Sequence, residues 1–265
     1  QLEGAHGPLS VQRSREILDT LTNSSAETTS LQRHIAIEEA VAGSPLVAGN
    51  KVTQLLDGAA TYPAMLAAIK HAKRNINMET YIIDDDAIGD QFSAALIERH
   101  GAGVQVNLIY DSAGSMNTPA AFFQRLSDGG LNVLEFNPLN PLDLRKGWEV
   151  NQRDHRKLLV VDGKVAFIGG INISSVYSGG SAKMGRNKLA AAKDIPWRDT
   201  HLCMEGPVVK EFQKLFMETW QKQNGQPLTS AFYFPQLENR GGEVVRALGS
   251  SPDDQSAVIP SHFHG

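Results

Sequence analysis

A short stretch of the sequence brings together the side chains that phosphodiester chemistry needs. It runs from His155 to Asn172 with the spacing H-x-K-x4-D-x6-G-G-x-N, in which Lys157, Asp162 and Gly169-Gly170 are the other fixed residues. An imidazole can attack phosphorus and form a covalent phospho-histidine, which divides one difficult displacement into two easier ones. A fixed ammonium and an amide can stabilise the charge on the phosphoryl oxygens. We therefore expect His155 to be the nucleophile and Lys157, Asn172 and Gly170 to contact the phosphate.

The residues within this stretch predict a β-hairpin that carries the chemical groups. His155 and Lys157 are two residues apart, so on a strand their side chains would lie on the same face. Asp162-Gly163 is a hairpin turn signal, and residues 164–168 have the composition of a returning strand. The Gly169-Gly170 pair then allows the backbone to come close to a ligand, and we expect Gly169 to have a structural role.

The same stretch resembles the HKD motif of the phospholipase D superfamily. Two other segments look like the bacterial cardiolipin synthase branch of that superfamily. They are Trp197-Arg198-Asp199-Thr200-His201, which is followed by Glu205-Gly206-Pro207, and Glu79-Thr80-Tyr81-Ile82-Ile83. The resemblance extends from about residue 50 to about residue 250 and corresponds to the first half of two-lobed family members.

The resemblance implies an enzyme that is built from two halves. One imidazole attacks phosphorus, and a second imidazole, from a second HKD motif, gives a proton to the leaving alcohol. The complete pattern occurs once in this sequence. We therefore expect the second half to come from a homodimer mate or from a separate C-terminal chain. The scheme uses no metal and no cofactor, and no His-x-x-x-His pair surrounds the motif.

Acidic and aromatic residues outside the motif are further candidates for the site. In the family that this chain resembles, an acid on a neighbouring strand holds the attacking imidazole, and Asp199 is at the matching place. Asp162 is expected to cap the hairpin turn, which is a structural role. Glu79 and Tyr81 come at the end of a predicted strand, so they could line the cleft or serve the structure. His201 is two residues after Asp199, and it too could line the cleft or serve the structure.

Strands and helices alternate along most of the chain. This alternation predicts an α/β fold with a mixed, largely parallel β-sheet and helices on both faces. The expected strands are residues 52–56, 75–83, 104–110, 132–136 and 200–205, and the expected helices are residues 62–74, 88–100, 120–126 and 207–220. We expect a helical N-terminal extension at 1–45 with helices at 10–21 and 29–42, a phospholipase D-like lobe with one HKD motif at 46–240, and the beginning of a second lobe or a tail at 241–265.

Two long loops flank the motif, at residues 137–153 and 174–196, and loops of this length are usually functional. The first loop is both apolar and basic, so it could contact a membrane surface or form a packed lid. The residues concerned are Leu139, Leu142, Leu144, Arg145, Lys146 and Trp148. Phe232-Tyr233-Phe234-Pro235 is a second candidate for membrane contact, with packing inside the domain as its alternative.

The composition restricts the classes of function. Of the 265 residues, 41% are hydrophobic and 20% are charged, which is typical of a globular protein. The net charge of −4 disfavours a polycationic nucleic-acid binder, so nucleic acid is an unexpected partner. Cys203 is the single cysteine, and no apolar run is long enough for a transmembrane helix. The resemblance implies a phospholipid substrate and a place at a membrane surface, with the periplasm as one option.

The expected function is phosphatidyl transfer or hydrolysis at the phosphodiester of a phospholipid. Two alternatives are a homodimeric nuclease-type phosphodiesterase and an inactive half or pseudoenzyme. The net negative charge of the chain disfavours the nuclease. The motif residues His155, Lys157 and Asn172 are all present, which argues against an enzyme that has lost its activity by mutation. Residues 111–115 lack the G-x-S-x-G pattern, so we expect them to shape a loop instead of supplying a serine nucleophile.

Overall fold

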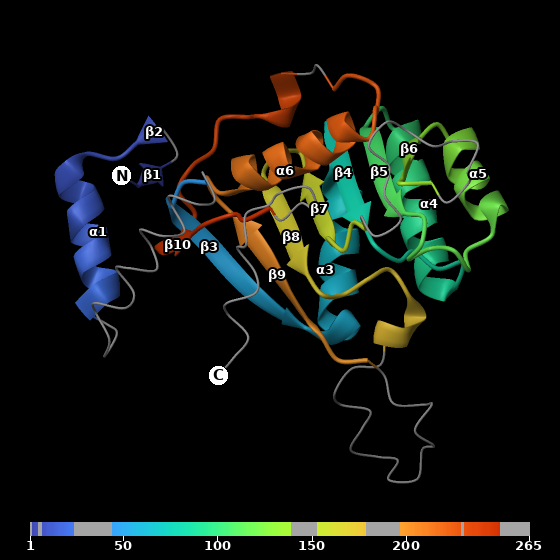
Figure 1. Cartoon of the computed structure of the whole chain (residues 1–265), viewed down its shortest axis with the longest axis horizontal. Helices are drawn as coiled ribbons and strands as arrows, with labels where there is room; N and C mark the ends of the chain where they lie inside the picture. The colour runs from blue at the N-terminus through green and yellow to red at the C-terminus, as the bar shows by residue number, and fades with distance from the viewer. Residues whose placement is uncertain are drawn as a thin grey trace, which may run out of the picture.

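A mixed β-sheet runs through the described part of the chain (Figure 1). The computed structural model describes residues 2–4, 7–23, 44–138, 153–178, 197–228 and 231–249. The strands are β1 (Glu3–Gly4), β2 (Gly7–Pro8), β3 (Val47–Leu56), β4 (Asn75–Thr80), β5 (Gln105–Asp111), β6 (Asn132–Phe136), β7 (Leu158–Val161), β8 (Val165–Gly169), β9 (Thr200–Glu205) and β10 (Glu243–Val245). The α-helices are α1 (Val11–Asn23), α3 (Asp57–His71), α4 (Ala87–Gly101), α5 (Ala120–Asp128) and α6 (Val209–Lys222).

The sheet has the order β2-β1-β3-β9-β8-β7-β4-β5-β6, and β10 also pairs with β3. The expectation of a mixed sheet is confirmed, but the expectation that it is largely parallel is wrong. Among the described residues, parallel pairing is confined to β4-β5-β6, to a single contact between β1 and β3, and to an isolated bridge between Ile83 and Ile173. The helices α4 and α5 supply the crossovers that parallel neighbours need. The tight turn after β7 can only join antiparallel strands, and β9 and β3 continue the antiparallel pattern outward from β8.

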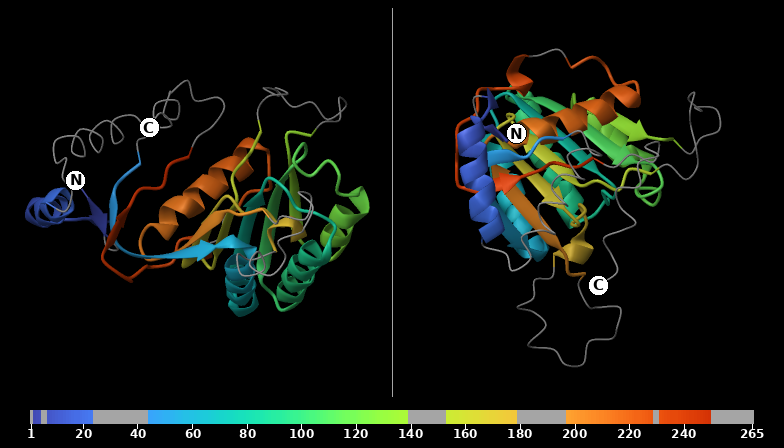
Figure 2. Two further views of the ribbon diagram at one scale, coloured as in Figure 1. Left: turned by 90° about the horizontal axis from the view of Figure 1, so that it is seen from below. Right: turned by 60° about the vertical axis from the view of Figure 1, so that its left-hand side comes forward.

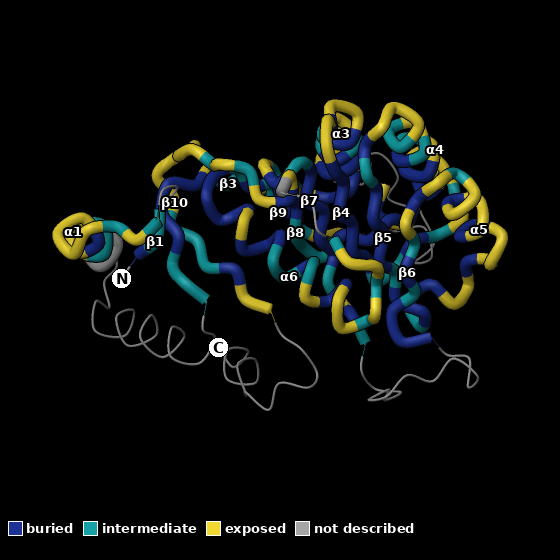
Figure 3. The backbone as a smooth tube through the Cα atoms, turned by 90° about the horizontal axis from the view of Figure 1, so that it is seen from above, coloured by how far each residue is buried: buried dark blue, intermediate teal, exposed yellow. Residues whose placement is uncertain are grey.

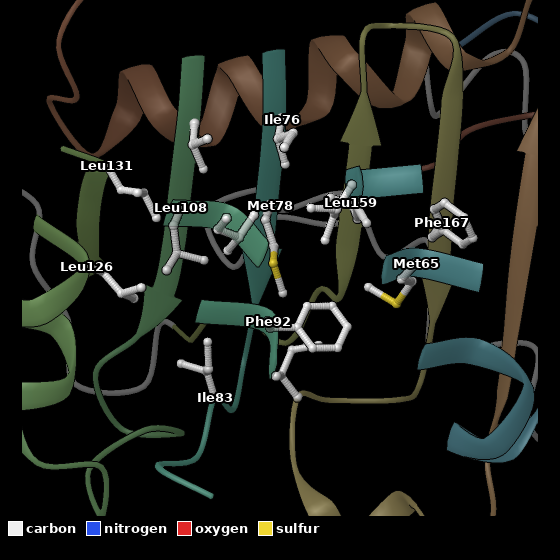
Figure 4. Close-up of a cluster of buried hydrophobic side chains, with 14 of the residues drawn as sticks. Met65, Ile76, Met78, Ile83, Phe92, Leu108, Leu126, Leu131, Leu159 and Phe167 are labelled. Carbon is white, nitrogen blue, oxygen red and sulfur yellow. The ribbon is translucent and has the colours of Figure 1, made fainter. Parts of the chain in front are cut away.

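Helices cover both faces of the sheet, as expected from the sequence. The helices α3, α4 and α5 pack on one face, and α6 packs alone on the other (Figures 2 and 3). The first face holds a continuous core in which Phe92 of α4 and Met65 of α3 meet Met78 and Leu108 of the central strands (Figure 4). Because both faces are covered, β7 is buried along its whole length and consists only of leucine and valine.

The N-terminal residues are part of this sheet and are not only a helical extension. Leu2 is buried, and β1 pairs with β3 through Glu3 and Val47. The helix that was expected at residues 10–21 is α1, whereas the helix expected at 29–42 lies outside the described residues. At the other end of the chain, β10 pairs antiparallel with β3, so it joins the sheet of the first lobe.

The hairpin between β7 and β8 contains the aspartate of the motif. Asp162 and Gly163 have φ values of 53° and 61°, and positive φ at both central residues is what a type I′ turn requires. The Asp162 carboxylate does not cap this turn, which corrects the expectation. Instead it accepts hydrogen bonds of 2.7 to 3.1 Å from the backbone N–H groups of residues 73–75, which connect α3 to β4. Asp162 therefore fastens the hairpin to the neighbouring connection at the end of β7 far from His155.

Replacing Asp162 with alanine should destabilise the fold and leave the chemical groups of the motif in place. Three backbone N–H groups would lose a charged acceptor, and we expect the free energy of unfolding to fall by about 3 kcal/mol. Urea unfolding measures this change, with Asp128→Ala as the control because Asp128 is an exposed acceptor at the end of α5. Equal stability of the two variants would contradict the structural role of Asp162.

Candidate active site

The candidate active site lies at the edge of the sheet where β4, β5, β6 and β8 end and where β7 and β9 begin. The start of a strand lies beside the end of its antiparallel partner, so the sheet brings these segments together. His155 and Lys157 precede β7, Asn172 follows β8, and Asp199 precedes β9. The carboxyl ends of strands in open α/β sheets are where such proteins bind ligands.

His155 is the exposed member of the motif pair, and it lies in the segment before β7 and not within a strand. Its ring contacts the ring of Tyr81, with 4.6 Å between the two centroids. Partial burial and, to a lesser degree, the Lys157 ammonium lower the pKa of the imidazole. A lowered pKa favours the neutral ring, which has the lone pair that attack on phosphorus requires.

Lys157 is buried beside His155 and places a cation in the site. Its Nζ atom donates a 2.6 Å hydrogen bond to the His155 carbonyl oxygen and lies 5.0 Å from the centroid of the Tyr81 ring. Burial lowers the pKa of Lys157 to about 8, although nearby carboxylates oppose the shift. The side chain is therefore mostly an ammonium at neutral pH and becomes neutral at higher pH. Tyr81 contacts both motif residues, so the structure brings it into the site.

The Asn172 side chain is buried and already engaged in the fold. Its Nδ2 donates to the Tyr177 hydroxyl at 2.9 Å, and its Oδ1 accepts from the Ile82 backbone N–H at 3.0 Å. The amide nitrogen has two N–H groups, of which the bond to Tyr177 uses one, and contact of the other with a phosphate oxygen stays a prediction. The bond to Ile82 holds the chain after β8 against the chain after β4.

The two glycines of the motif make room for side chains of β9 as well as for a ligand. A Cβ atom on Gly170 would overlap the Asp199 carboxylate, and one on Gly169 would lie 2.8 Å from His201 Nδ1. The Asp199 carboxylate accepts a 2.7 Å hydrogen bond from the Thr200 N–H. Among the described residues no hydrogen bond joins Asp199 to the His155 ring, although the carboxylate acts on that ring through its charge. The orienting role of Asp199 stays a prediction.

The imidazole of His201 is buried next to the site. It is the cross-strand neighbour of Gly169 and is only 1% exposed. Within the described part of the chain, neither ring nitrogen has a hydrogen-bond partner. Burial, reinforced by the charge of Lys157, lowers the pKa of His201 to about 4, so the ring is neutral at pH 7.

Glu79 does not lie with Tyr81 at the site but points to the opposite face of the sheet. There its Oε1 atom is 3.0 Å from Arg156 Nε, close to Asp154 and to Thr219 of α6. The sequence reasoning missed Asp154 and Arg156. One signal could have found Arg156, since on the strand that the sequence predicts here a residue between His155 and Lys157 faces the other way.

Residues 111–115 shape a loop, as expected. The Asp111 carboxylate accepts hydrogen bonds from the N–H groups of Ala113 and Gly114 at 2.8 and 2.9 Å. Its other oxygen accepts from the Asp154 N–H at 2.9 Å, just before His155. The loop after β5 is thus tied to the segment that carries the imidazole.

Of the two segments that the sequence suggested for membrane contact, one lies outside the described residues and the other within them. Residues 139–152 and 179–196, including the apolar and basic loop from Leu139 to Trp148, lie outside the described residues. Tyr233 is buried, and its hydroxyl accepts a 3.1 Å hydrogen bond from Asn107 Nδ2, which fits packing inside the domain. No helix within the described ranges is long and apolar enough to cross a membrane. In those same ranges, no group of three or more His, Cys, Asp or Glu side chains could hold a metal ion.

Comparisons with known proteins show what the chain is similar to. A family model described as the phospholipase D-like domain of cardiolipin synthase matches residues 65–179. Cardiolipin synthase A of Pseudomonas entomophila is 36% identical over 225 residues, which are 83% of this chain and 43% of that protein. The cardiolipin synthase of Alkalihalophilus pseudofirmus is 34% identical over 222 residues, which are 83% of this chain and 42% of that protein. The phospholipase D family member Nuc from Salmonella typhimurium has a TM-score of 0.45 at 17% identity, covering 65% of this chain and 95% of its own.

Residues 65–179 are thus similar to the phospholipase D-like domain of cardiolipin synthase. The chain spans less than half of the length of the two cardiolipin synthases, 43% and 42%.

The buried His201 should make the folded state sensitive to acid. The folded-state pKa of about 4 lies below the ordinary value of 6.5, so below pH 6.5 the unfolded chain binds a proton that the folded chain does not. The stability conferred by the neutral ring is therefore lost as the pH falls from 6.5 towards 4, by up to about 3 kcal/mol. His201→Leu should remove this part of the loss, as measured by urea unfolding at several pH values.

His71→Leu is the control for this prediction, because His71 is exposed at the end of α3. The expected result is that only the His201 variant gains stability relative to the wild type as the pH falls. A difference between wild type and His201→Leu that does not change with pH would contradict the assignment.

Proposed function

We propose that this chain is one half of an enzyme that transfers the phosphatidyl group of a phospholipid through a phospho-histidine at His155. The proposal rests on the pairing of His155 with Lys157 at the edge of the sheet. An exposed imidazole with a lowered pKa lies beside a buried ammonium, and the two are linked by the 2.6 Å bond from Lys157 Nζ to the His155 carbonyl. Further support comes from the named activity of the relatives, which are cardiolipin synthases.

In the first step, a ring nitrogen of His155 attacks phosphorus. A P–N bond forms and the P–O bond to the leaving alcohol breaks, while an acid from the second half gives that oxygen its proton. The Lys157 ammonium and the free N–H of Asn172 stabilise the charge that develops on the non-bridging oxygens. Because Lys157 is buried, its attraction to these oxygens is screened less than it would be in water.

In the second step, an acceptor oxygen attacks the phosphoryl group on His155. The acceptor loses its proton to the base of the second half, a new P–O bond forms, and the P–N bond to His155 breaks. If the acceptor is the alcohol of a second phospholipid, the product is a cardiolipin-type lipid. If the acceptor is water, the reaction is the hydrolysis of a phospholipase D.

The proposed mechanism needs a second imidazole, and the described residues place none opposite His155. His71 and Lys73 share the first H-x-K spacing, but Met78 occupies the place of the aspartate. The Lys73 N–H bonds to Asp162, so this pair lies at the far end of β7. We therefore propose that a second half completes the site, from a second copy of this chain or from a separate chain.

A phospholipid substrate places the working enzyme at a membrane surface. Trp197 supports this part of the proposal, because it is 62% exposed and lies two residues before Asp199. Its ring contacts the Tyr177 ring, with 5.7 Å between centroids, and Tyr177 is the hydrogen-bond partner of Asn172. Trp is a residue type that favours the boundary between lipid and water.

Substitutions at the motif pair test the proposed function. In the assembly that turns over phosphatidylglycerol vesicles, His155→Ala should abolish product formation because no atom remains to form the P–N bond. Lys157→Ala should lower kcat about 10²- to 10³-fold, as the loss of one oxyanion donor does. Product can be measured by mass spectrometry of the extracted lipids.

His71→Ala is a matched control, since it removes an imidazole with the same H-x-K spacing from an exposed site. It should keep the wild-type rate. A near wild-type rate in His155→Ala would refute the proposed role of the motif. Full turnover by a protein that remains monomeric in light scattering would refute the need for a second half.

A further inference from the structure

Behind the motif, on the face opposite His155 and Lys157, two buried carboxyl groups and a partly buried guanidinium form a cluster. Arg156 lies between the two motif residues and reaches into the interface between β4 and α6. Its Nε atom is 3.0 Å from Glu79 Oε1 and 3.3 Å from Asp154 Oδ1. Its guanidinium also donates a hydrogen bond to the Thr219 hydroxyl of α6.

The cluster contains two carboxyl groups and one guanidinium, and the Lys157 ammonium attracts Asp154 from the other face of the segment. The Glu79 side chain is 0% exposed and that of Asp154 is 4% exposed. Among the described residues, no well-aligned hydrogen-bond donor reaches either Glu79 oxygen or Asp154 Oδ2. Two adjacent carboxylates without enough donors are costly in a buried site, and a single proton on one of them removes that cost.

The surroundings of Glu79 favour that proton. Burial raises the pKa of Glu79 well above its ordinary value, the charge of Asp154 raises it further, and Arg156 only partly opposes the shift. Other charged groups also act on the cluster. Glu218 of α6 acts on Arg156, and Lys157 and His155 interact with Asp154 from the other side of the segment. A protonated Glu79 can donate its hydrogen to Asp154, which leaves the guanidinium paired with one negative charge.

The cluster is connected to the backbone on both sides of His155. The Asp154 N–H, on one side, donates to Asp111 at 2.9 Å. On the other side, the Arg156 N–H donates to Asp154 Oδ1 at 3.1 Å. The carbonyl of His155 itself accepts from Lys157 Nζ. A movement of the Asp154 carboxylate would therefore move the peptide groups that set the direction of the imidazole.

We propose that Glu79, Asp154 and Arg156 are positioning residues that fix the peptide segment carrying His155, and that they do so only while one proton is held between the two carboxyl groups. None of them touches the substrate. When the proton is lost, two carboxylates compete for one guanidinium, Asp154 shifts, and the imidazole loses its fixed direction. The proposal rests on the proposed function in one respect, namely that His155 is the group whose direction matters for catalysis.

The direct test is the nuclear magnetic resonance signal of the His155 ring, followed as a function of pH. The signal is assigned by its loss in His155→Asn. In the wild type it should show the titration of the ring itself, an inflection from Lys157, whose pKa is about 8, and a third inflection when the cluster loses its proton. In Glu79→Gln, whose amide imitates a protonated carboxyl group, the inflection from the cluster should disappear and the other two should remain.

Glu205→Gln is the matched control, because Glu205 is also a strand glutamate that pairs with a cation, Lys51 at 3.3 Å, but on the surface. It should keep all three inflections. Three inflections in Glu79→Gln, or only two in the wild type, would overturn the proposal. This measurement needs no turnover, so it holds even if the proposed function fails.

Kinetics give an independent readout that a purely structural role would not produce. Arg156→Gln should lower kcat about 100-fold and leave KM nearly unchanged, because misdirection of a reacting group costs rate and not affinity. Arg156→Lys, which keeps the charge, should restore part of kcat. Equal changes in kcat for both variants, or a change in KM alone, would overturn the proposal. If an Arg156 variant does not fold, the result with Glu79→Gln decides.

Discussion

The register of β7 against β8 is the constraint from which the candidate site follows. The turn at Asp162-Gly163 sets that register, and β8 then pairs with β9 so that Gly169 lies between Lys157 and His201. A slip by one residue would turn every side chain of the strand to the other face. The carboxylate of Asp162 fastens this turn to the neighbouring connection, which explains how an aspartate far from the imidazole belongs to the motif.

The two faces of the segment that contains His155, Arg156 and Lys157 have different proposed roles. His155 and Lys157 supply the groups for chemistry on one side, and Arg156 anchors the segment on the other side to β4 and α6. The exposed imidazole of His155, the proposed nucleophile, is held by a backbone segment that is fixed by two buried carboxyl groups and by Arg156. Buried ion clusters are expensive and often add little stability, so their retention here fits a gain in precision at the site.

Local features of this fold could be predicted from the sequence, and long-range ones could not. The strands expected at 132–136 and 200–205 are β6 and β9 with the same bounds, because alternating apolar residues and flanking turns mark them. The partner of each strand is set by packing across the whole chain, so the sequence overstated the parallel share of the sheet. The spacing of the motif is also a local feature of the sequence, and it indicated His155 and Lys157 as candidate site residues. That Glu79 turns away from the site to meet Arg156 depends on how β4 lies against α6, which no local pattern encodes.

The measurement that tests the central claim most directly is the trapping of the covalent intermediate. The assembled protein is mixed with a phospholipid, quenched within one turnover, and digested for mass spectrometry. The account predicts a phosphatidyl or phosphoryl adduct on the peptide that contains His155, and none on the peptide that contains His71. An adduct on another residue, or steady turnover with no adduct on His155, would contradict it.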